Sequence, residues 1–172
     1  MNRVSLTGHE LNLAAKIGVD IACYNLTKGA EHKHGSPPEQ ALQMSIMGAI
    51  GELAFAKFLG EFWSGNMSDY KAKDVNGYQI RTTLTWAKNY SLILHPADSD
   101  DDIFVALAVD PSTYRQVEMR GWCRGREGKR DVFWRDDTTI EKPLRKGGDA
   151  FFVKQVALHP MSDLPKRLTS VR

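Results

Sequence analysis

The sequence predicts an α+β fold in which two N-terminal helices pack on a mixed or mostly antiparallel β-sheet. Apolar residues recur at three- and four-residue spacing in the first third of the chain, and short apolar or alternating segments follow. An order of helices first and strands afterwards is typical of α+β proteins. The 172 residues, of which 42% are hydrophobic, have the length of a single domain (1–172) with a core that needs no disulfides.

Two segments have helical periodicity. In residues 10–26, small and apolar side chains fall on one face. The second helix begins at residues 36–39 (SPPE), where a serine cap, a proline and a glutamate form a capping box, and it ends at Gly60. Gly48 and Gly51 lie inside this helix, where each glycine costs about 1 kcal/mol relative to alanine. We therefore expect a close packing partner there and a central position for the helix.

The strongest local signal is a β-hairpin in residues 73–84. Asn76 and Gly77 separate two alternating segments, and this pair favours the type I′ turn because both central residues need positive φ. A loop is expected before the hairpin, at 61–73. Further strands are expected at 90–95, 103–109, 116–123 and 151–156, and a last short helix at 160–168.

The charge is small overall but unevenly distributed. The net charge is +2, with 9 basic and 12 acidic side chains in residues 1–102 and 14 basic and 9 acidic in 103–172. The segment 120–146 is the most basic, and Trp122, Phe133 and Trp134 interleave with its charges, a pattern typical of a surface that binds nucleic acid. A solvated hairpin is the alternative interpretation. The residues predicted to contact DNA are Arg120, Arg124, Arg126, Lys129, Arg130 and Arg135.

Composition also favours a cytoplasmic protein. We see no apolar run close to the roughly 20 residues that span a bilayer, and no secretory signal, so no membrane partner is expected. Cys23 and Cys123 lie far apart in the chain, which argues against a disulfide scaffold or a cysteine-based metal site.

One set of polar residues is predicted to converge. Gln79 and Arg81 are two apart in a strand and therefore share a face, whereas Ile80 points to the core. In a two-residue hairpin, Asp74 lies level with Gln79 or Ile80. The helical Glu52 is expected to approach the same place.

These motifs resemble the PD-(D/E)xK nuclease superfamily, which is restriction-endonuclease-like, and in particular its small phage-encoded members. The resemblance is carried by GAIGELAFAKFLG, KDVNGYQIRTTL, LILHPADSDDDIFV and RGWCRG, and it covers residues 48–125. It implies a restriction-endonuclease-like core and a nuclease that hydrolyses DNA with Mg²⁺ or Mn²⁺, in the host cytoplasm if the chain is phage-encoded.

The resemblance also implies residue roles. Asp74 would ligate the metal, Glu52 would complete the site, and Ile80 would offer its backbone carbonyl. Gln79 and Arg81 would occupy the catalytic positions at which the family most often has glutamate and lysine. A cation and a divalent metal suit this reaction because the transition state of phosphodiester hydrolysis gains negative charge.

Three departures from the family pattern support a second hypothesis. Gln79 removes a negative charge, Arg81 is a poor proton donor, and residues 85–89 leave room only for a short turn where the family places a helix. The alternative is therefore a catalytically inactive protein of this fold that binds nucleic acid or inhibits a host defence protein. A structural component without any site is the third hypothesis, and the sequence leaves open whether the chain forms a homodimer.

The acidic run at 95–102 (HPADSDDD) is interpreted as a solvated connection between strands. It lacks the glycine and the terminal glutamate of a calcium-binding loop.

Overall fold

The computed structural model describes residues 2–27, 38–65, 74–84, 90–135 and 149–166, and it confirms the α+β class. Two long helices, α1 (Gly8–Thr27) and α2 (Pro38–Leu59), precede most of the strands. The strands are β1 (Arg3–Ser5), β2 (Gln79–Thr83), β3 (Ser91–Leu94), β4 (Ile103–Val109), β5 (Gln116–Arg124), β6 (Trp134–Arg135) and β7 (Ala150–Lys154). Short helical turns are α3 (Gly125–Gly128), η1 (Asp131–Phe133), η2 (Gln155–Ala157) and η3 (Met161–Asp163).

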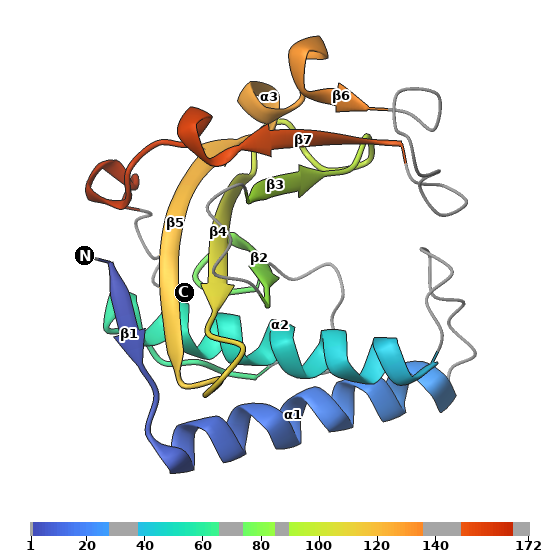
Figure 1. The fold of residues 1–172 in the computed structure, drawn as a ribbon, viewed down its shortest axis with the longest axis vertical. Coiled ribbons are helices and arrows are strands. Elements are labelled where there is room, and N and C mark those ends of the chain that lie inside the picture. The colour runs from blue at the N-terminus through green and yellow to red at the C-terminus, as the bar shows by residue number, and fades with distance from the viewer. Residues whose placement is uncertain (1, 28–37, 66–73, 85–89, 136–148, 167–172) are drawn as a thin grey trace, which may run out of the picture.

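The strands form two sheets rather than the single sheet expected (Figure 1). In the four-stranded sheet the order is β1-β5-β4-β2, and β2 runs parallel to β4 while the other pairs are antiparallel. In the three-stranded antiparallel sheet the order is β3-β7-β6. The connection from β2 to its parallel neighbour β4 thus contains β3, which belongs to the other sheet.

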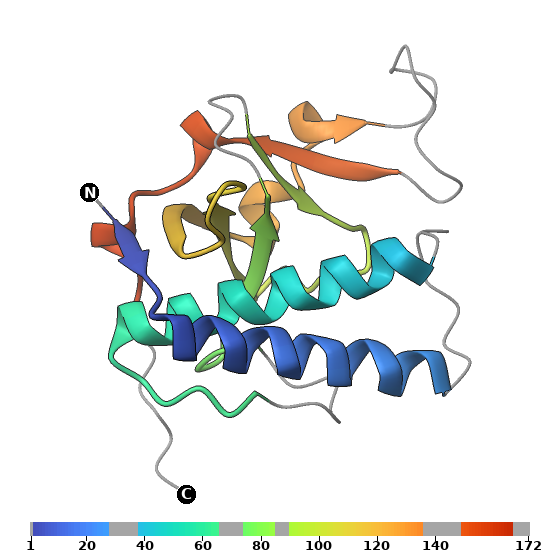
Figure 2. The same ribbon diagram turned by 60° about the horizontal axis from the view of Figure 1, so that its bottom comes forward.

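The two helices lie side by side across one face of the four-stranded sheet, and α2 is the inner one (Figure 2). They approach closely at Gly18, where an added Cβ would lie 2.4 Å from the Cα of Ile46. At the start of α1, Thr7 and Glu10 form a capping box: each backbone N–H donates to the other's side chain, at 2.7 and 3.2 Å. Lys57 of α2 bonds the Glu10 carboxylate at 2.8 Å, which fastens the two helices together.

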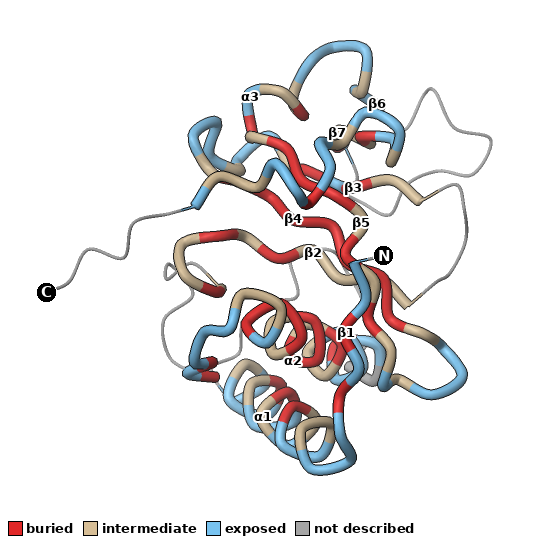
Figure 3. Tube along the Cα trace, turned by 90° about the vertical axis from the view of Figure 1, so that its left-hand side faces the viewer, coloured by how far each residue is buried: buried red, intermediate tan, exposed pale blue. Residues whose placement is uncertain are grey.

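Strand β4 divides the core into two parts. All seven of its residues are buried, as the red tube in Figure 3 shows. Ile103, Val105 and Leu107 point into the cluster between α2 and the larger sheet. Phe104 and Ala106 point the other way, into the cluster between the two sheets. Because successive side chains of β4 point to opposite faces, this strand contributes to both core clusters.

Helix α2 has the length and apolar composition of a membrane span over Gln40–Leu59, which the sequence analysis had not anticipated. One face of it is used inside the protein, since Ala49, Ile50 and Phe55 are almost fully buried in the main cluster, whereas Leu42 and Met44 are exposed. Here α2 serves as the core helix of the fold.

The predicted elements are largely confirmed, with three corrections. Strands β3, β4, β5 and β7 lie within a residue or two of the predicted ranges, and the end of α2 at Gly60, with φ +71°, is confirmed. Strands β1 and β6 were not predicted, and the second sheet was not distinguished from the first. The predicted C-terminal helix is only the 3-10 turn η3 within the described residues, and the serine cap at 36 lies outside them.

Candidate functional site: an acidic pair at the sheet edge

The predicted turn places Asp74 beside β2. Asn76 and Gly77 have φ values of +45° and +82°, as a type I′ turn requires, and Val75 and Tyr78 pair across it. Among the described residues, the first arm of the hairpin consists of the single bridge between Val75 and Tyr78, so it is shorter than expected. Asp74 Oδ2 accepts a hydrogen bond of 2.6 Å from the backbone N–H of Ile80, which confirms that these residues lie level.

In the described sheet, the backbone N–H and C=O of Ile80 lie on the outer side of β2. Strand β2 is an edge strand, and its N–H at Ile80 bonds Asp74 rather than β4. In a strand the N–H and C=O of one residue point to the same side. The Ile80 carbonyl therefore also faces away from β4, on the side where Asp74 lies.

Glu52 of α2 approaches Asp74 from the helix layer. Trp63 donates its indole N–H to Glu52 Oε2 at 3.1 Å. Burial, reinforced by the negative charge of Asp74, raises the pKa of Glu52 to about 7, and the Trp63 hydrogen bond opposes this only in part. The two carboxyl groups, predicted to converge, are thus close enough to interact.

Asp74 has a raised pKa as well. Burial raises it, whereas the hydrogen bond from Ile80 and the positive charge of Arg81 oppose the increase. Among the described residues, these two half-buried acids thus lie close to one cation, Arg81. Such a pair is stabilised either by a proton or by a further cation.

Arg81 projects from the face of β2 that is turned towards the second sheet. Its guanidinium forms an ion pair with Asp98 at 3.1 Å and lies 5.2 Å from the centre of the Phe104 ring. Tyr90 is near it: burial raises the pKa of Tyr90 to about 12, and the positive charges of Arg81 and Arg120 oppose this increase. Gln79, half-buried, lies on the same face of β2 as Arg81.

The acidic loop, residues 95–102, is not simply a solvated connection. Besides the ion pair with Arg81, its carboxylates bind cations of the basic segment: Asp100 pairs with Lys129 at 2.5 Å, and Asp101 pairs with Arg126. Lys129 also donates to the backbone oxygen of Asp98 at 2.7 Å. The acidic loop therefore links Arg81 to α3 and neutralises part of the basic segment.

The other predicted DNA contacts differ in exposure. The side chain of Arg120 is buried; its guanidinium pairs with Glu118 at 3.0 Å and donates to Gln155 at 2.9 Å. Arg130 and Arg135 are exposed and lie over aromatic rings, at 5.2 and 5.3 Å from the ring centres.

Arg124 is half-buried, and its backbone N–H donates to Glu127. The predicted stacking residue Trp122 is buried, so its ring is not presented to solvent. Trp134 remains partly exposed.

Three residues at this site were not found from the sequence: Trp63, Tyr90 and Asp98. Each meets a predicted residue from a different structural element, and no periodicity of a helix or strand connects the two. Of the three, only Asp98 belongs to a pattern visible in the sequence, the acidic run at 95–102. The cation with which it pairs depends on how the two sheets stack.

In the part of the chain that the structure describes, no group of three or more His, Cys, Asp or Glu side chains is arranged to hold a metal. The carboxylates that converge here are the pair Glu52 and Asp74. Comparisons of the chain with protein-family models, with curated proteins and with solved structures found no match.

Proposed function

We propose that this protein is a divalent-metal-dependent nuclease that hydrolyses DNA at the edge of β2, with a restriction-endonuclease-like core. The observation that carries the proposal is the pair of half-buried carboxyl groups, Glu52 and Asp74, close to the Arg81 cation. A half-buried acidic pair that meets a single cation among the described residues suits a ligand that brings positive charge.

The donor set fits Mg²⁺ or Mn²⁺. Both prefer oxygen ligands, and Mg²⁺ is usually bound by one or two carboxylates while water and substrate phosphate complete its shell. Asp74 and Glu52 would hold the ion, with the outward-facing carbonyl of Ile80 as a third donor. When bound, the ion would lower the pKa of a water molecule and offset the charge on the phosphate.

The remaining residues would bind and orient the substrate. Arg81 has five N–H donors, and the described ion pair with Asp98 uses one nitrogen, so the guanidinium retains donors for a phosphate oxygen. Gln79, on the same face, offers a neutral amide to the same phosphate. Trp63 would hold Glu52 in place, because its indole N–H already bonds one carboxylate oxygen. Arg135 on β6, the outer strand of the second sheet, and Arg130 just before η1 are exposed and would attract the DNA backbone.

The test is a cleavage assay with Mg²⁺ and with Mn²⁺ on plasmid, linear duplex and single strands. We expect metal-dependent cleavage by the wild type and its loss in Asp74→Asn and in Glu52→Gln, which keep the shape of each side chain. Asp110→Asn is the matched control, because Asp110 serves a surface turn through Ser112 and Thr113. Cleavage that survives Asp74→Asn in purified protein would contradict the proposal.

One observation favours a second candidate, a catalytically inactive protein of this fold that binds nucleic acid. Arg81 already has a carboxylate partner in Asp98, and Gln79 supplies no charge. Salt-sensitive DNA binding by folded wild type, without cleavage in either metal, would select this candidate.

A further inference from the structure

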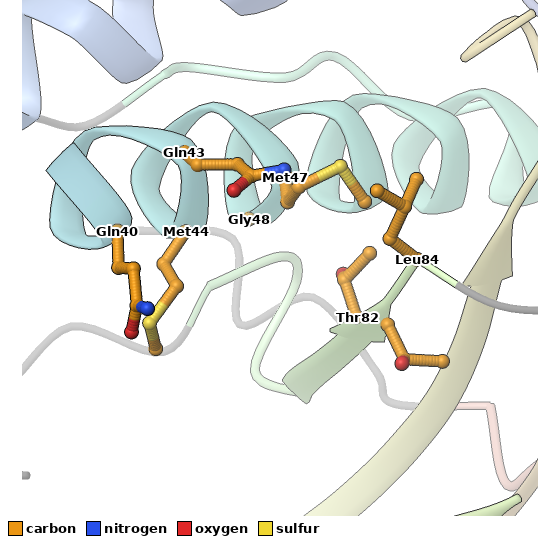
Figure 4. A pocket seen from close by; sticks show the side chains of 8 residues that line it. Gln40, Gln43, Met44, Met47, Gly48, Thr82 and Leu84 are labelled. Carbon is orange, nitrogen blue, oxygen red and sulfur yellow. The ribbon is translucent and has the colours of Figure 1, made fainter. Parts of the chain in front are cut away.

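A cavity of about 400 Å³ lies between the first half of α2 and the end of β2. Figure 4 shows Gln40, Met44 and Gln43 of the helix on one side, with Thr82 of β2 and Leu84, just after the strand, on the other. None of the metal-site residues lines it.

The cavity continues the proposed site along both of its walls. On α2, Gly48 and Met44 lie one and two turns before Glu52 in the same inclined row, and one turn is about 5.4 Å. On β2, Thr83 follows Arg81 on the same face at a distance of about 6.6 Å along the strand. The cavity is therefore about one nucleotide unit from the place where a phosphate would meet Asp74 and Arg81.

The glycine at position 48 keeps this space open. An added Cβ at Gly48 would meet nothing within 4 Å, in contrast to Gly51, whose Cβ would lie 1.9 Å from Thr82 Oγ1. A close packing partner was expected at both glycines of this helix. Packing requires a glycine only at position 51. Gly48 instead leaves one wall of the cavity without a side chain.

The lining suits a flat, uncharged, hydrogen-bonding group. Among the described residues, no charged side chain borders the cavity. The thioethers of Met44 and Met47 are polarisable surfaces for an aromatic face, and the Gln43 amide matches the donors and acceptors on the edge of a base. Thr82 Oγ1 is buried against α2 at Gly51 and has no hydrogen-bond partner among the described residues.

We propose that this cavity is a base-binding subsite that receives one unpaired nucleobase of the bound DNA strand. The inference rests on the proposed function, since it assumes that the phosphate of the same strand lies at Asp74 and Arg81. A base in a duplex is stacked between its neighbours and cannot enter the cavity. The preferred substrate is therefore single-stranded DNA, or a duplex with an unpaired base beside the cleaved bond.

The test measures binding without catalysis, in metal-free buffer at low salt. The probes are a fluorescent four-nucleotide single strand, the same strand built of abasic nucleotides, and a blunt duplex. Both single strands carry the same phosphates, so their difference isolates the bases. We expect the wild type to bind the strand with bases about tenfold more tightly than the abasic strand, since base contacts are worth a few kcal/mol or less.

The diagnostic variant is Gly48→Leu, which fills the cavity with a good helix former. It should reduce the affinity for the strand with bases to that for the abasic strand while leaving the abasic affinity unchanged. Gly8→Leu is the matched control: Gly8 begins α1, an added Cβ there also meets open space, and the Glu10–Lys57 bond places it near the opposite end of α2. Thermal unfolding of both variants verifies that they fold.

The outcomes separate this inference from the nuclease proposal. Equal affinity of the wild type for both strands, or unchanged binding by folded Gly48→Leu, would overturn the subsite even if metal-dependent cleavage occurs. Base-dependent binding lost in Gly48→Leu would support the subsite even if the wild type cleaves nothing. Tighter binding of the blunt duplex than of the single strand would also overturn it.

Discussion

The ion pair between Arg81 and Asp98, with 3.1 Å between Nη2 and Oδ1, joins the edge strand of one sheet to the loop that leaves the other. Asp98 also accepts the backbone N–H of His95 at 2.9 Å, so its carboxylate is fixed on both sides. The orientation of Arg81 is therefore set by a loop outside its own sheet.

Asp98→Asn should release Arg81 while retaining an acceptor for His95. We expect cleavage to fall about tenfold in kcat/KM and the free energy of unfolding to fall by about 1 kcal/mol, as for partly exposed ion pairs. Cleavage kinetics and urea unfolding measure the two effects. Asp101→Asn is the control, because the pair of Asp101 with Arg126 is exposed. A kcat/KM unchanged in Asp98→Asn would contradict the positioning role.

Glu52 should make the protein less stable as the pH rises. Its pKa is about 7 in the folded chain against an ordinary value of 4.5, so the folded state binds more protons between these limits. This group contributes up to about 3 kcal/mol to the free energy of unfolding below pH 4.5, and the contribution is lost as the pH rises through 7. Asp74, whose pKa is also raised, acts in the same direction.

Urea unfolding in metal-free buffer from pH 5 to pH 8 measures this slope. Glu52→Gln should flatten it and should be the more stable chain at pH 8. Glu10→Gln is the control: the Lys57 hydrogen bond lowers the pKa of Glu10 to about 2, so this acid does not titrate in that range. A wild-type stability that rises from pH 5 to pH 8 would refute the assignment.

Mn²⁺ should oppose the loss of stability at pH 8. An ion that binds the folded chain at one hundred times its Kd stabilises it by about 2.7 kcal/mol, which raises the Tm by about 5–10 °C for a chain of this size. Differential scanning fluorimetry with a Mn²⁺ titration measures the shift. Asp74→Asn should abolish it and Asp101→Asn should retain it. An equal shift in Asp74→Asn would place the ion elsewhere.

Gly51→Ala should destabilise the protein although alanine favours helices. The new Cβ would lie 1.9 Å from Thr82 Oγ1, so helix and strand must separate, at a net loss of about 1–2 kcal/mol. The double variant with Thr82→Ala should recover most of this loss. Gly48→Ala, which meets open space, should instead stabilise the helix by up to about 1 kcal/mol. Chemical denaturation of the wild type, Gly51→Ala, Thr82→Ala and the double variant completes the cycle, and Gly48→Ala is measured beside them.

DNA affinity should depend on the exposed arginines that have no carboxylate partner among the described residues, Arg130 and Arg135, rather than on all six predicted residues. Arg130→Ala and Arg135→Ala should each weaken DNA binding and reduce its salt slope by about one. Arg126→Ala should have a smaller effect because Asp101 already neutralises that charge. Lys16→Ala on the exposed side of α1 is the control. Anisotropy titrations at several salt concentrations distinguish these variants, and equal effects of Arg126 and Arg130 would contradict the division.

The sequence predicted what depends on local geometry. The Asn76–Gly77 turn fixes Asp74 opposite Ile80, and periodicity placed Glu52 in a central helix, so both acids could be named. The partners of these residues depend on layer stacking. The connection between the parallel strands β2 and β4 passes through the second sheet. Asp98 lies on this connection, and the spacing of residues in the sequence does not predict its ion pair with Arg81.

The pairing of β1 with β5 has a consequence for folding during synthesis. Ser5 and Gln116, which bond in the finished sheet, are 111 positions apart, so a ribosome adding 5–20 residues per second needs on the order of ten seconds between them. During that interval α1 and α2 emerge without the sheet that covers the apolar side of α2. Nascent chains of this protein are therefore exposed to aggregation until β5 is synthesised, and slower elongation would prolong their need for a chaperone.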